Sequence, residues 1–69
     1  MTETALMQHA RQAVVEGLVR EHARQTGVDG DRVTLAVNAA RNAVKDGRSA
    51  WYAYEVIGKS WIDEKMEAV

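Results

Sequence analysis

Apolar residues recur at helical spacing in three separate segments of the chain. In the first segment one face carries Leu6, Met7, Ala10, Ala13, Val14, Gly17 and Leu18. Residues that repeat at i, i+3, i+4 and i+7 share one face of an α-helix. The pattern therefore predicts an amphipathic helix over residues 3–26, which Gly27 ends because glycine favours the left-handed conformation after a helix. We expect this face to pack against the rest of the protein.

A second, smaller apolar stripe on the same segment consists of Val15, Val19 and Ala23. A monomer of three helices has difficulty covering two stripes of one helix. A chain of 69 residues without cysteine also needs an aid to stability, and oligomerisation is a common one. We therefore interpret the three residues as a dimer interface. The alternative is that they are partly exposed, as single apolar residues often are.

The second segment predicts a helix over residues 30–46. Its single apolar stripe contains Val33, Ala36, Val37, Ala40, Ala43 and Val44. We expect Asp29 to be the N-cap, because Val28 and Val33 then take the two positions that pack together in a hydrophobic staple. Small side chains dominate this stripe, so the axis of the helix should lie close to its neighbours.

The third segment predicts a helix over residues 50–67, with Ser49 as its cap. Its inner stripe contains Ala50, Ala53, Tyr54, Ile57, Gly58 and Trp61, flanked by Trp51 and Ile62. We expect these large side chains to fill the space that alanine and glycine leave on the other helices. Gly47 leaves only a short connection from the second helix, which favours an antiparallel hairpin. The fold class is thus all-α, a single three-helix domain over residues 1–69 that dimerises.

Composition and charge narrow the possible functions. The chain is 46% apolar and 28% charged, as in globular proteins. A formal charge of −1 gives no global attraction for nucleic acid or anionic lipid. The sequence has neither the apolar region of a signal peptide nor the length of a membrane span. We therefore expect a cytoplasmic protein that does not bind membranes.

Residues with catalytic or metal-binding chemistry do not form a recognisable set. His9 and His22 are thirteen residues apart on one predicted helix, beyond the i, i+4 spacing at which two imidazoles share a metal. The glycines do not form a phosphate-binding loop, which needs a strand before it. A bundle of this size also has little room for a pocket that excludes water. We expect no catalytic residue, no metal, no cofactor and no enzymatic activity.

Basic residues form two pairs at i, i+4, where like charges repel. The possible contacts to an anionic surface are Arg20, Arg24, Arg41, Lys45 and Arg48. One interpretation is that they bind acidic protein or phosphate. The other, which we favour, is that Glu16 offsets Arg20 one turn away and that arginine near a helix C-terminus complements the dipole. A small dimeric nucleic-acid-binding transcriptional regulator therefore remains the alternative function, disfavoured because the third helix lacks a basic stripe for DNA.

Tyr52 and Val56 form an apolar pair on the side of the third helix opposite Tyr54 and Trp61. One helix cannot bury both sides in a small bundle, and tyrosine is enriched in interface hot spots. We expect a partner-binding surface that contains Tyr52, Val56, Lys59 and Met66. The alternative is an isolated exposed tyrosine.

These observations favour a small non-enzymatic module for protein–protein interaction. We expect a homodimer that masks the surface of another protein and so acts as an inhibitor, an adaptor or a regulatory factor. Accessory inhibitors encoded by phages or mobile elements fit this size and this absence of catalytic chemistry. The identity of the partner does not follow from the sequence.

Overall fold

A computed structural model describes residues 2–67, with side chains from Leu6 to Asp63. Within these residues the protein is all-helical, with three helices and no strand. The elements are α1 (Thr2–Thr26), α2 (Asp31–Lys45), α3 (Ala50–Tyr52), the π-helical segment η1 (Ala53–Gly58) and α4 (Lys59–Glu67). The last three follow one another without a break and are called the third helix below. The all-α prediction and its three helical segments are confirmed.

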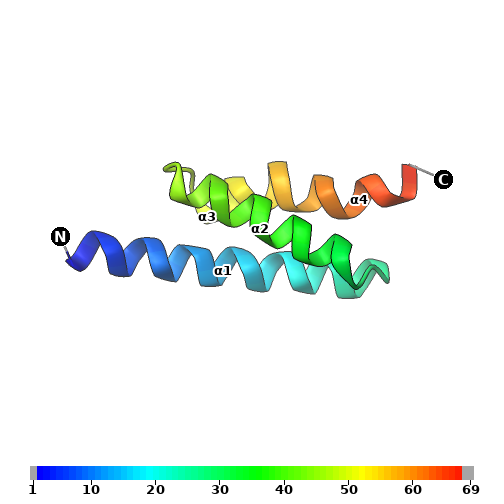
Figure 1. Cartoon of the computed structure of the whole chain (residues 1–69), viewed down its shortest axis with the longest axis horizontal. Helices are drawn as coiled ribbons and strands as arrows, with labels where there is room; N and C mark the ends of the chain where they lie inside the picture. Colours follow the sequence, from blue (N-terminus) through cyan, green and yellow to red (C-terminus); the bar gives the residue numbers. More distant parts are fainter. Residues whose placement is uncertain (1, 68–69) are drawn as a thin grey trace.

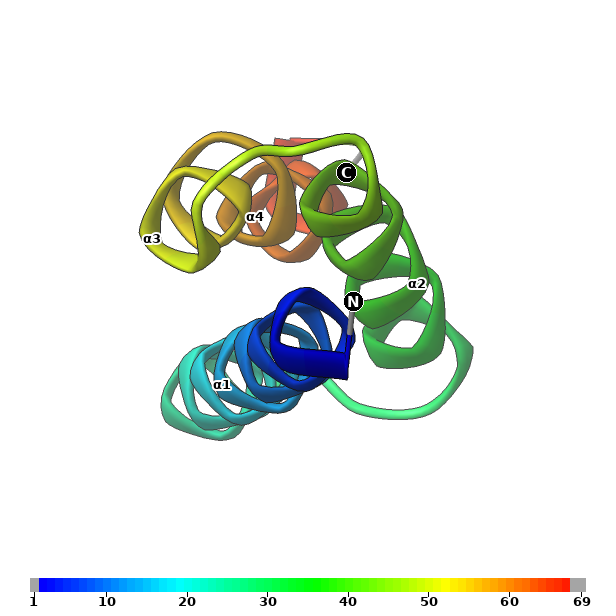
Figure 2. The same ribbon diagram turned by 90° about the vertical axis from the view of Figure 1, so that its left-hand side faces the viewer.

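The molecule is elongated, with principal extents of 45 × 17 × 17 Å. In Figure 1 the chain runs forward along α1, back along α2 and forward again along the third helix. The end view shows the three helices around a common axis (Figure 2). The first turns of α1 extend past the turn between α2 and α3 (Figure 1). No helix of the described residues is long and apolar enough to cross a membrane.

The turn after α1 is closed by backbone hydrogen bonds around Gly27. The N–H of Val28 donates to the carbonyl of Ala23 at 2.9 Å, and the N–H of Gly27 donates to Arg24 at 3.3 Å. This Schellman pattern requires a left-handed residue, and Gly27 has a φ of 80°. The turn thereby directs Val28 into the core, where it is buried. Gly27 ends the first helix as predicted.

Asp29 is not the N-cap of α2, which corrects the prediction. Gly30 takes that position with a φ of 79° and no side-chain cap bond, while Asp29 is exposed. The carbonyl of Gly30 accepts hydrogen bonds from the N–H groups of Val33 and Thr34. Glycine at this position lets the chain reverse within a few residues. The prediction of Asp29 relied on the hydrophobic staple between Val28 and Val33 and did not take the backbone conformation of Gly30 into account.

The turn after α2 repeats the Schellman pattern. Gly47 has a φ of 104°, and the N–H of Arg48 donates to Ala43 at 3.0 Å. The next residue, Ser49, caps the third helix because its hydroxyl oxygen accepts a hydrogen bond from the N–H of Tyr52 at 3.0 Å. The predicted cap is confirmed. This turn fixes the relative positions of Arg48 and Tyr52.

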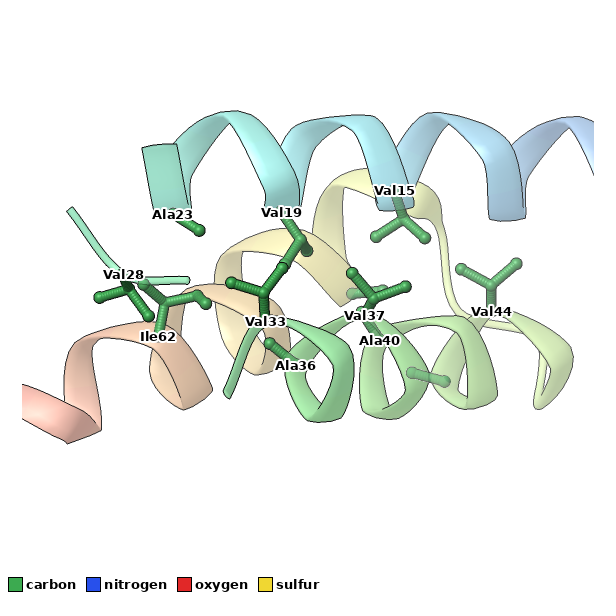
Figure 3. Close-up of a cluster of buried hydrophobic side chains, with 12 residues drawn as sticks. Val15, Val19, Ala23, Val28, Val33, Ala36, Val37, Ala40, Val44 and Ile62 are labelled. Atoms are coloured by element: carbon green, nitrogen blue, oxygen red, sulfur yellow. The ribbon is translucent and has the colours of Figure 1, made fainter. Parts of the chain in front are cut away.

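Among the residues whose side chains are described, the hydrophobic core consists of valine, alanine and isoleucine side chains. Its members are Val15, Val19, Ala23, Val28, Val33, Ala36, Val37, Ala40, Ala43, Val44, Ala53 and Ile62 (Figure 3). The contribution of α1 is therefore the smaller stripe. Val15 and Val19 expose 0% of their surface and Ala23 exposes 2% within the single chain. The assignment of these three residues to a dimer interface is wrong.

The larger apolar face of α1 points away from the core. Leu6, Met7 and Val14 are 68%, 52% and 54% exposed. Polar residues also join the other face of α1 to α2. Gln8 donates to the backbone carbonyl of Lys45 at 3.3 Å, and Gln12 accepts from the side chain of Arg41. Apolar periodicity alone does not register such hydrogen bonds.

The third helix widens into a π-helix where it crosses α1. Its buried positions Ala53, Gly58 and Ile62 are separated by five and then four residues, because a π-helix bonds residue i to i+5. A Cβ atom on Gly58 would clash with Cγ2 of Val19. Glycine at this position therefore permits the close approach of α1. The sequence pattern assumed a regular α-helix and did not predict the π segment.

The aromatic residues surround the core and do not fill it. Tyr54, Ile57 and Trp61 are partly buried and pack against the core cluster. Trp51, predicted to flank the inner stripe, is 60% exposed. The valine and alanine side chains already fill the space between the helices, because Gly58 lets α1 and the third helix approach closely. The expectation that Trp51 contributes to the core is wrong.

Candidate protein-binding surface

Tyr52 lies in the first turn of the third helix and is 39% exposed. The guanidinium carbon of Arg48 lies 4.9 Å from the centre of its ring. A cation over the face of an aromatic ring is attracted by the ring's negative charge density. Both residues flank the Ser49 cap, so the turn itself holds the pair together. Sequence reasoning placed Arg48 and Tyr52 in two different candidate sites, and the structure brings them together.

A shallow depression lies beside this pair, between the end of α2 and the third helix. Its volume is about 380 Å³, and its lining residues are Ala43, Asp46, Gly47, Arg48, Tyr52 and Ile57. The lining combines the ring of Tyr52 and the side chain of Ile57 with the charges of Asp46 and Arg48. A side chain of a partner protein that has both apolar and polar parts fits such a site better than a bare ion does.

Val56 follows Tyr52 at i+4 and is 49% exposed. Its backbone carbonyl accepts a hydrogen bond from the hydroxyl of Ser60 at 2.8 Å. We call Arg48, Tyr52 and Val56, together with the depression beside them, the Tyr52 surface. The exposure of Tyr52 and Val56 agrees with their expected position on the outer side of the third helix.

Lys59 is directed to a different set of residues. Its ammonium lies 3.6 Å from a carboxylate oxygen of Glu55 and 5.8 Å from the ring centre of Tyr54. The π-helical segment changes the angle between successive residues, so regular helical spacing from Val56 misplaces Lys59. Met66, the fourth predicted member, lies outside the residues whose side chains are described.

Trp51 is an exposed aromatic residue next to Tyr52 that sequence reasoning assigned to the interior. Its ring centre lies 5.4 Å from that of Tyr54. Tyr54 in turn meets the ring of His22 on α1 edge-on, at 6.1 Å. Trp51 thus lies at the junction of α1 and α3. The signal that was available is its position in the first turn of a helix, where neighbouring elements cover a side chain least.

Most of the predicted anion-binding residues are paired with protein groups. Arg20 lies 2.9 Å from a carboxylate oxygen of Glu16, as expected from their spacing, and Arg41 lies 3.7 Å from the other oxygen of Glu16. Arg24 donates to Glu21. Among the described residues, no carboxylate forms an ion pair with Lys45 or Arg48, which flank the turn after α2. The five basic residues therefore do not form one continuous cationic surface.

The hydrogen bond between Arg24 and Glu21 affects both groups. It lowers the pKa of the Glu21 carboxyl and raises the pKa of the Arg24 guanidinium. Gln25 also donates to Glu21, at 3.0 Å. The three side chains form a local network on the last two turns of α1, which leaves Arg24 less available to an external anion.

The two histidines lie in separate surroundings. Nε2 of His22 lies 2.8 Å from Oδ1 of Asp63, a contact that joins α1 to α4. His9 is exposed. Within the described part of the chain, no three histidine, cysteine, aspartate or glutamate side chains are arranged to hold a metal ion. His22 therefore contributes a contact between helices.

Comparisons with protein-family models, with curated proteins and with solved structures find no match to this chain.

Proposed function

We propose that this protein is a small non-enzymatic interaction module whose Tyr52 surface docks on another protein. It acts by masking the surface of that partner, as an inhibitor, an adaptor or a regulatory factor. The observation that carries the proposal is the exposed ring of Tyr52, held under Arg48 at the edge of a depression of about 380 Å³. Tyrosine and arginine are enriched among the residues that dominate binding energy.

The arrangement of the two side chains supports a protein partner. Arg48 and Tyr52 contact each other in the free protein. Binding therefore costs these side chains less conformational entropy than it costs isolated surface residues. We expect the partner to insert an apolar or aromatic side chain beside Tyr52. We also expect it to offer a carboxylate or a carbonyl oxygen to Arg48, whose five N–H groups are donors only.

A protein partner is proposed in preference to nucleic acid because of the ion pairs on α1. Nucleic-acid binding needs cations that face phosphates together. Glu16 lies next to both Arg20 and Arg41, and Glu21 lies next to Arg24. Each carboxylate repels phosphate and competes for the guanidinium.

The proposal includes two statements about architecture. The first is that α2 and the third helix act as an antiparallel hairpin, whose turn presents Arg48 and Tyr52. The second is that the protein functions as a homodimer. The paths of the helices in Figure 1 support the first statement, and the small size of the chain supports the second.

Comparative affinity capture tests the docking role of Tyr52. The tagged protein, its Tyr52→Ala variant and a Leu35→Ala control are exposed to the same extract of source cells. Leu35 lies on α2 and is not part of the Tyr52 surface. Its exposed fraction of 49% is similar to the 39% of Tyr52. We expect the native protein and the control to retain the same partner protein. The amount retained by Tyr52→Ala should be at least about tenfold lower, as for a hot-spot residue.

Circular dichroism of the three proteins serves as the control for folding. Tyr52 is not in the core, so the variant should keep native helicity. Equal retention of every captured protein by Tyr52→Ala and the native chain contradicts the proposal.

A further inference from the structure

An aspartate followed by a glycine lies in each of the two turns of the chain. Asp29 and Gly30 lie between α1 and α2, and Asp46 and Gly47 lie between α2 and α3. The two turns are at opposite ends of α2 (Figure 1). The backbone nitrogen of a glycine is open to reaction with the preceding side chain, because glycine has no Cβ atom to shield it and adopts many conformations. Each pair is therefore a candidate for modification of the main chain.

The reaction converts aspartate to isoaspartate in two steps. The backbone nitrogen of the glycine first attacks Cγ of the aspartate, so that a C–N bond forms and a Cγ–O bond breaks. The hydroxyl of the carboxyl group leaves with the amide proton as water, and the product is a cyclic succinimide. Addition of one water to the main-chain carbonyl carbon of the ring then breaks the bond between this carbon and nitrogen. The main chain now runs through Cβ and Cγ, and neither step needs an oxidant or a cofactor.

The two pairs have similar access to water. All four residues are exposed, and φ is positive at both glycines, 79° at Gly30 and 104° at Gly47. Each pair also lines a shallow depression, with a volume of about 280 Å³ beside Asp29 and about 380 Å³ beside Asp46. Exposure therefore does not distinguish the two aspartates.

The attacking nitrogens differ in their hydrogen bonds. The N–H of Gly47 donates to the carbonyl of Val44 at 2.9 Å. Among the described residues, no group accepts a hydrogen bond from the N–H of Gly30. The nitrogen must lose its proton and turn toward Cγ before it attacks, so the hydrogen bond of Gly47 has to break first. The nitrogen of Gly30 needs no such step.

The positions of the two aspartates relative to the Schellman turns explain this difference. Asp46 lies inside the turn after α2, where its own N–H donates to the carbonyl of Asn42 at 3.0 Å and the N–H of Arg48 closes the pattern at Ala43. The turn after α1 ends at the N–H of Val28, one residue before Asp29. Asp29 thus follows the hydrogen-bonded turn, whereas Asp46 is part of one.

We propose that Asp29 is a site of spontaneous isomerisation to isoaspartate in the folded protein, and that the hydrogen bond of Gly47 protects Asp46 from the same reaction. The modified residue presents a free α-carboxylate beside the main chain, which is the group that protein-isoaspartate carboxyl methyltransferases methylate. The protected turn carries Arg48, so the Tyr52 surface keeps its geometry as the protein ages. This inference is independent of the proposed function, because the turn at Asp29 shares no residue with the Tyr52 surface.

Prolonged incubation of the folded chain in neutral buffer tests the proposal. Cleavage at arginine afterwards releases residues 25–32 and 42–48, each with one aspartate–glycine pair. Chromatography and mass spectrometry then separate and quantify the isoaspartyl form of each peptide. We expect Asp29 to convert at least about fivefold faster than Asp46, the factor that corresponds to one hydrogen bond of average net strength.

A parallel incubation in denaturant is the control for the role of the fold. It removes the hydrogen bond of Gly47, so the two aspartates should convert at similar rates. The variant Asp29→Glu is the control for the site, because the longer side chain closes a less favourable ring. It should show no conversion in residues 25–32 and an unchanged rate in residues 42–48. Circular dichroism should show native helicity for this variant, since Asp29 is exposed.

Methyl transfer provides a second readout. Protein-isoaspartate carboxyl methyltransferase with labelled S-adenosylmethionine should label the incubated native chain and should label incubated Asp29→Glu much less. Equal rates at Asp29 and Asp46 in the folded chain overturn the proposal, and so does faster conversion of Asp46. A folded chain in which Asp29 stays unchanged overturns it as well, because the fold then protects both turns.

Discussion

Gly58 is the residue on which the closest approach between α1 and the third helix depends. A Cβ atom at this position would clash with the side chain of Val19, whereas one on Gly17 would meet nothing. The two glycines have opposite roles, although both occupy helix interiors. Glycine costs about 1 kcal/mol against alanine in a helix, and only at Gly58 does packing offset this cost.

The variant Gly58→Ala should therefore lower the free energy of unfolding by about 1 to 3 kcal/mol, the usual cost of overpacking. Chemical denaturation followed by circular dichroism measures this loss. Gly17→Ala is the matched control and should raise stability by up to about 1 kcal/mol, at concentrations where the monomer dominates. Adding Val19→Ala to Gly58→Ala removes the clash, so the double variant should lose less than the sum of its single variants. Additive losses contradict the close-approach argument.

The Arg24–Glu21 pair predicts a pH effect at a single residue. The hydrogen bond from Arg24 lowers the pKa of Glu21, so the folded state favours the ionised carboxyl. Its small contribution to stability is present above the ordinary pKa of glutamate and is lost as pH falls through the lowered value. In Arg24→Gln the pKa of Glu21 should rise toward its ordinary value, as measured by NMR titration. Arg20→Gln, which affects a pair with Glu16, should leave it unchanged.

At the scale of elements, the π-helical segment determines which residues of the third helix face the core. Ala53 and Gly58 are both buried although five residues separate them. A regular α-helix brings residues four apart onto one face. The segment therefore contains one residue more than the α-helical repeat needs, and this extra residue lies between two buried positions.

Removal of Val56 should convert the segment to a regular α-helix and keep Ala53 and Ile62 directed to the core. We expect the shortened protein to fold, with helicity and a thermal midpoint near those of the native chain. Removal of Asn38, an exposed residue of α2, is the matched control. It should unfold the protein because it rotates the rest of α2 by about 100°. If the two deletions are equally damaging, the segment does not carry an extra residue.

The local signals that predicted the three helices were glycine stops and apolar spacing, and both depend only on neighbouring residues. Gly27 and Gly47 end their helices for a backbone reason visible in the sequence. The π segment has no such local signal. It ends at Gly58, which lies against Val19, a residue far away along the chain.

At the scale of the whole molecule, the two apolar stripes of α1 exchange their expected roles. The number and size of apolar residues favoured the face with Leu6 and Met7 as the core. The face with Val15 and Val19 is buried instead, and the same face meets α2 through the hydrogen bond that Gln8 donates to the carbonyl of Lys45 and the one that Gln12 accepts from Arg41. Which stripe packs inside depends on the partner helices, and one sequence segment does not contain that information.

The sequence predicted only part of the candidate surface, because some of its members depend on contacts that one sequence segment does not contain. The exposure of Tyr52 and Val56 followed from their side of the third helix. The contact between Arg48 and Tyr52 depends on the geometry of a turn, and the separation of Lys59 depends on the π segment. Sequence periodicity therefore located the surface but not all of its members.

Because the aromatic rings lie outside the core, the tryptophan fluorescence of the protein depends on surroundings near its surface. Trp51 is 60% exposed beside Tyr52, whereas Trp61 is partly covered by Arg32, whose guanidinium lies 6.0 Å from its ring. The two indoles therefore occupy environments of different polarity. The emission of Trp51 reports on the water near the junction of α1 and the third helix, so the native chain carries an optical probe of that region.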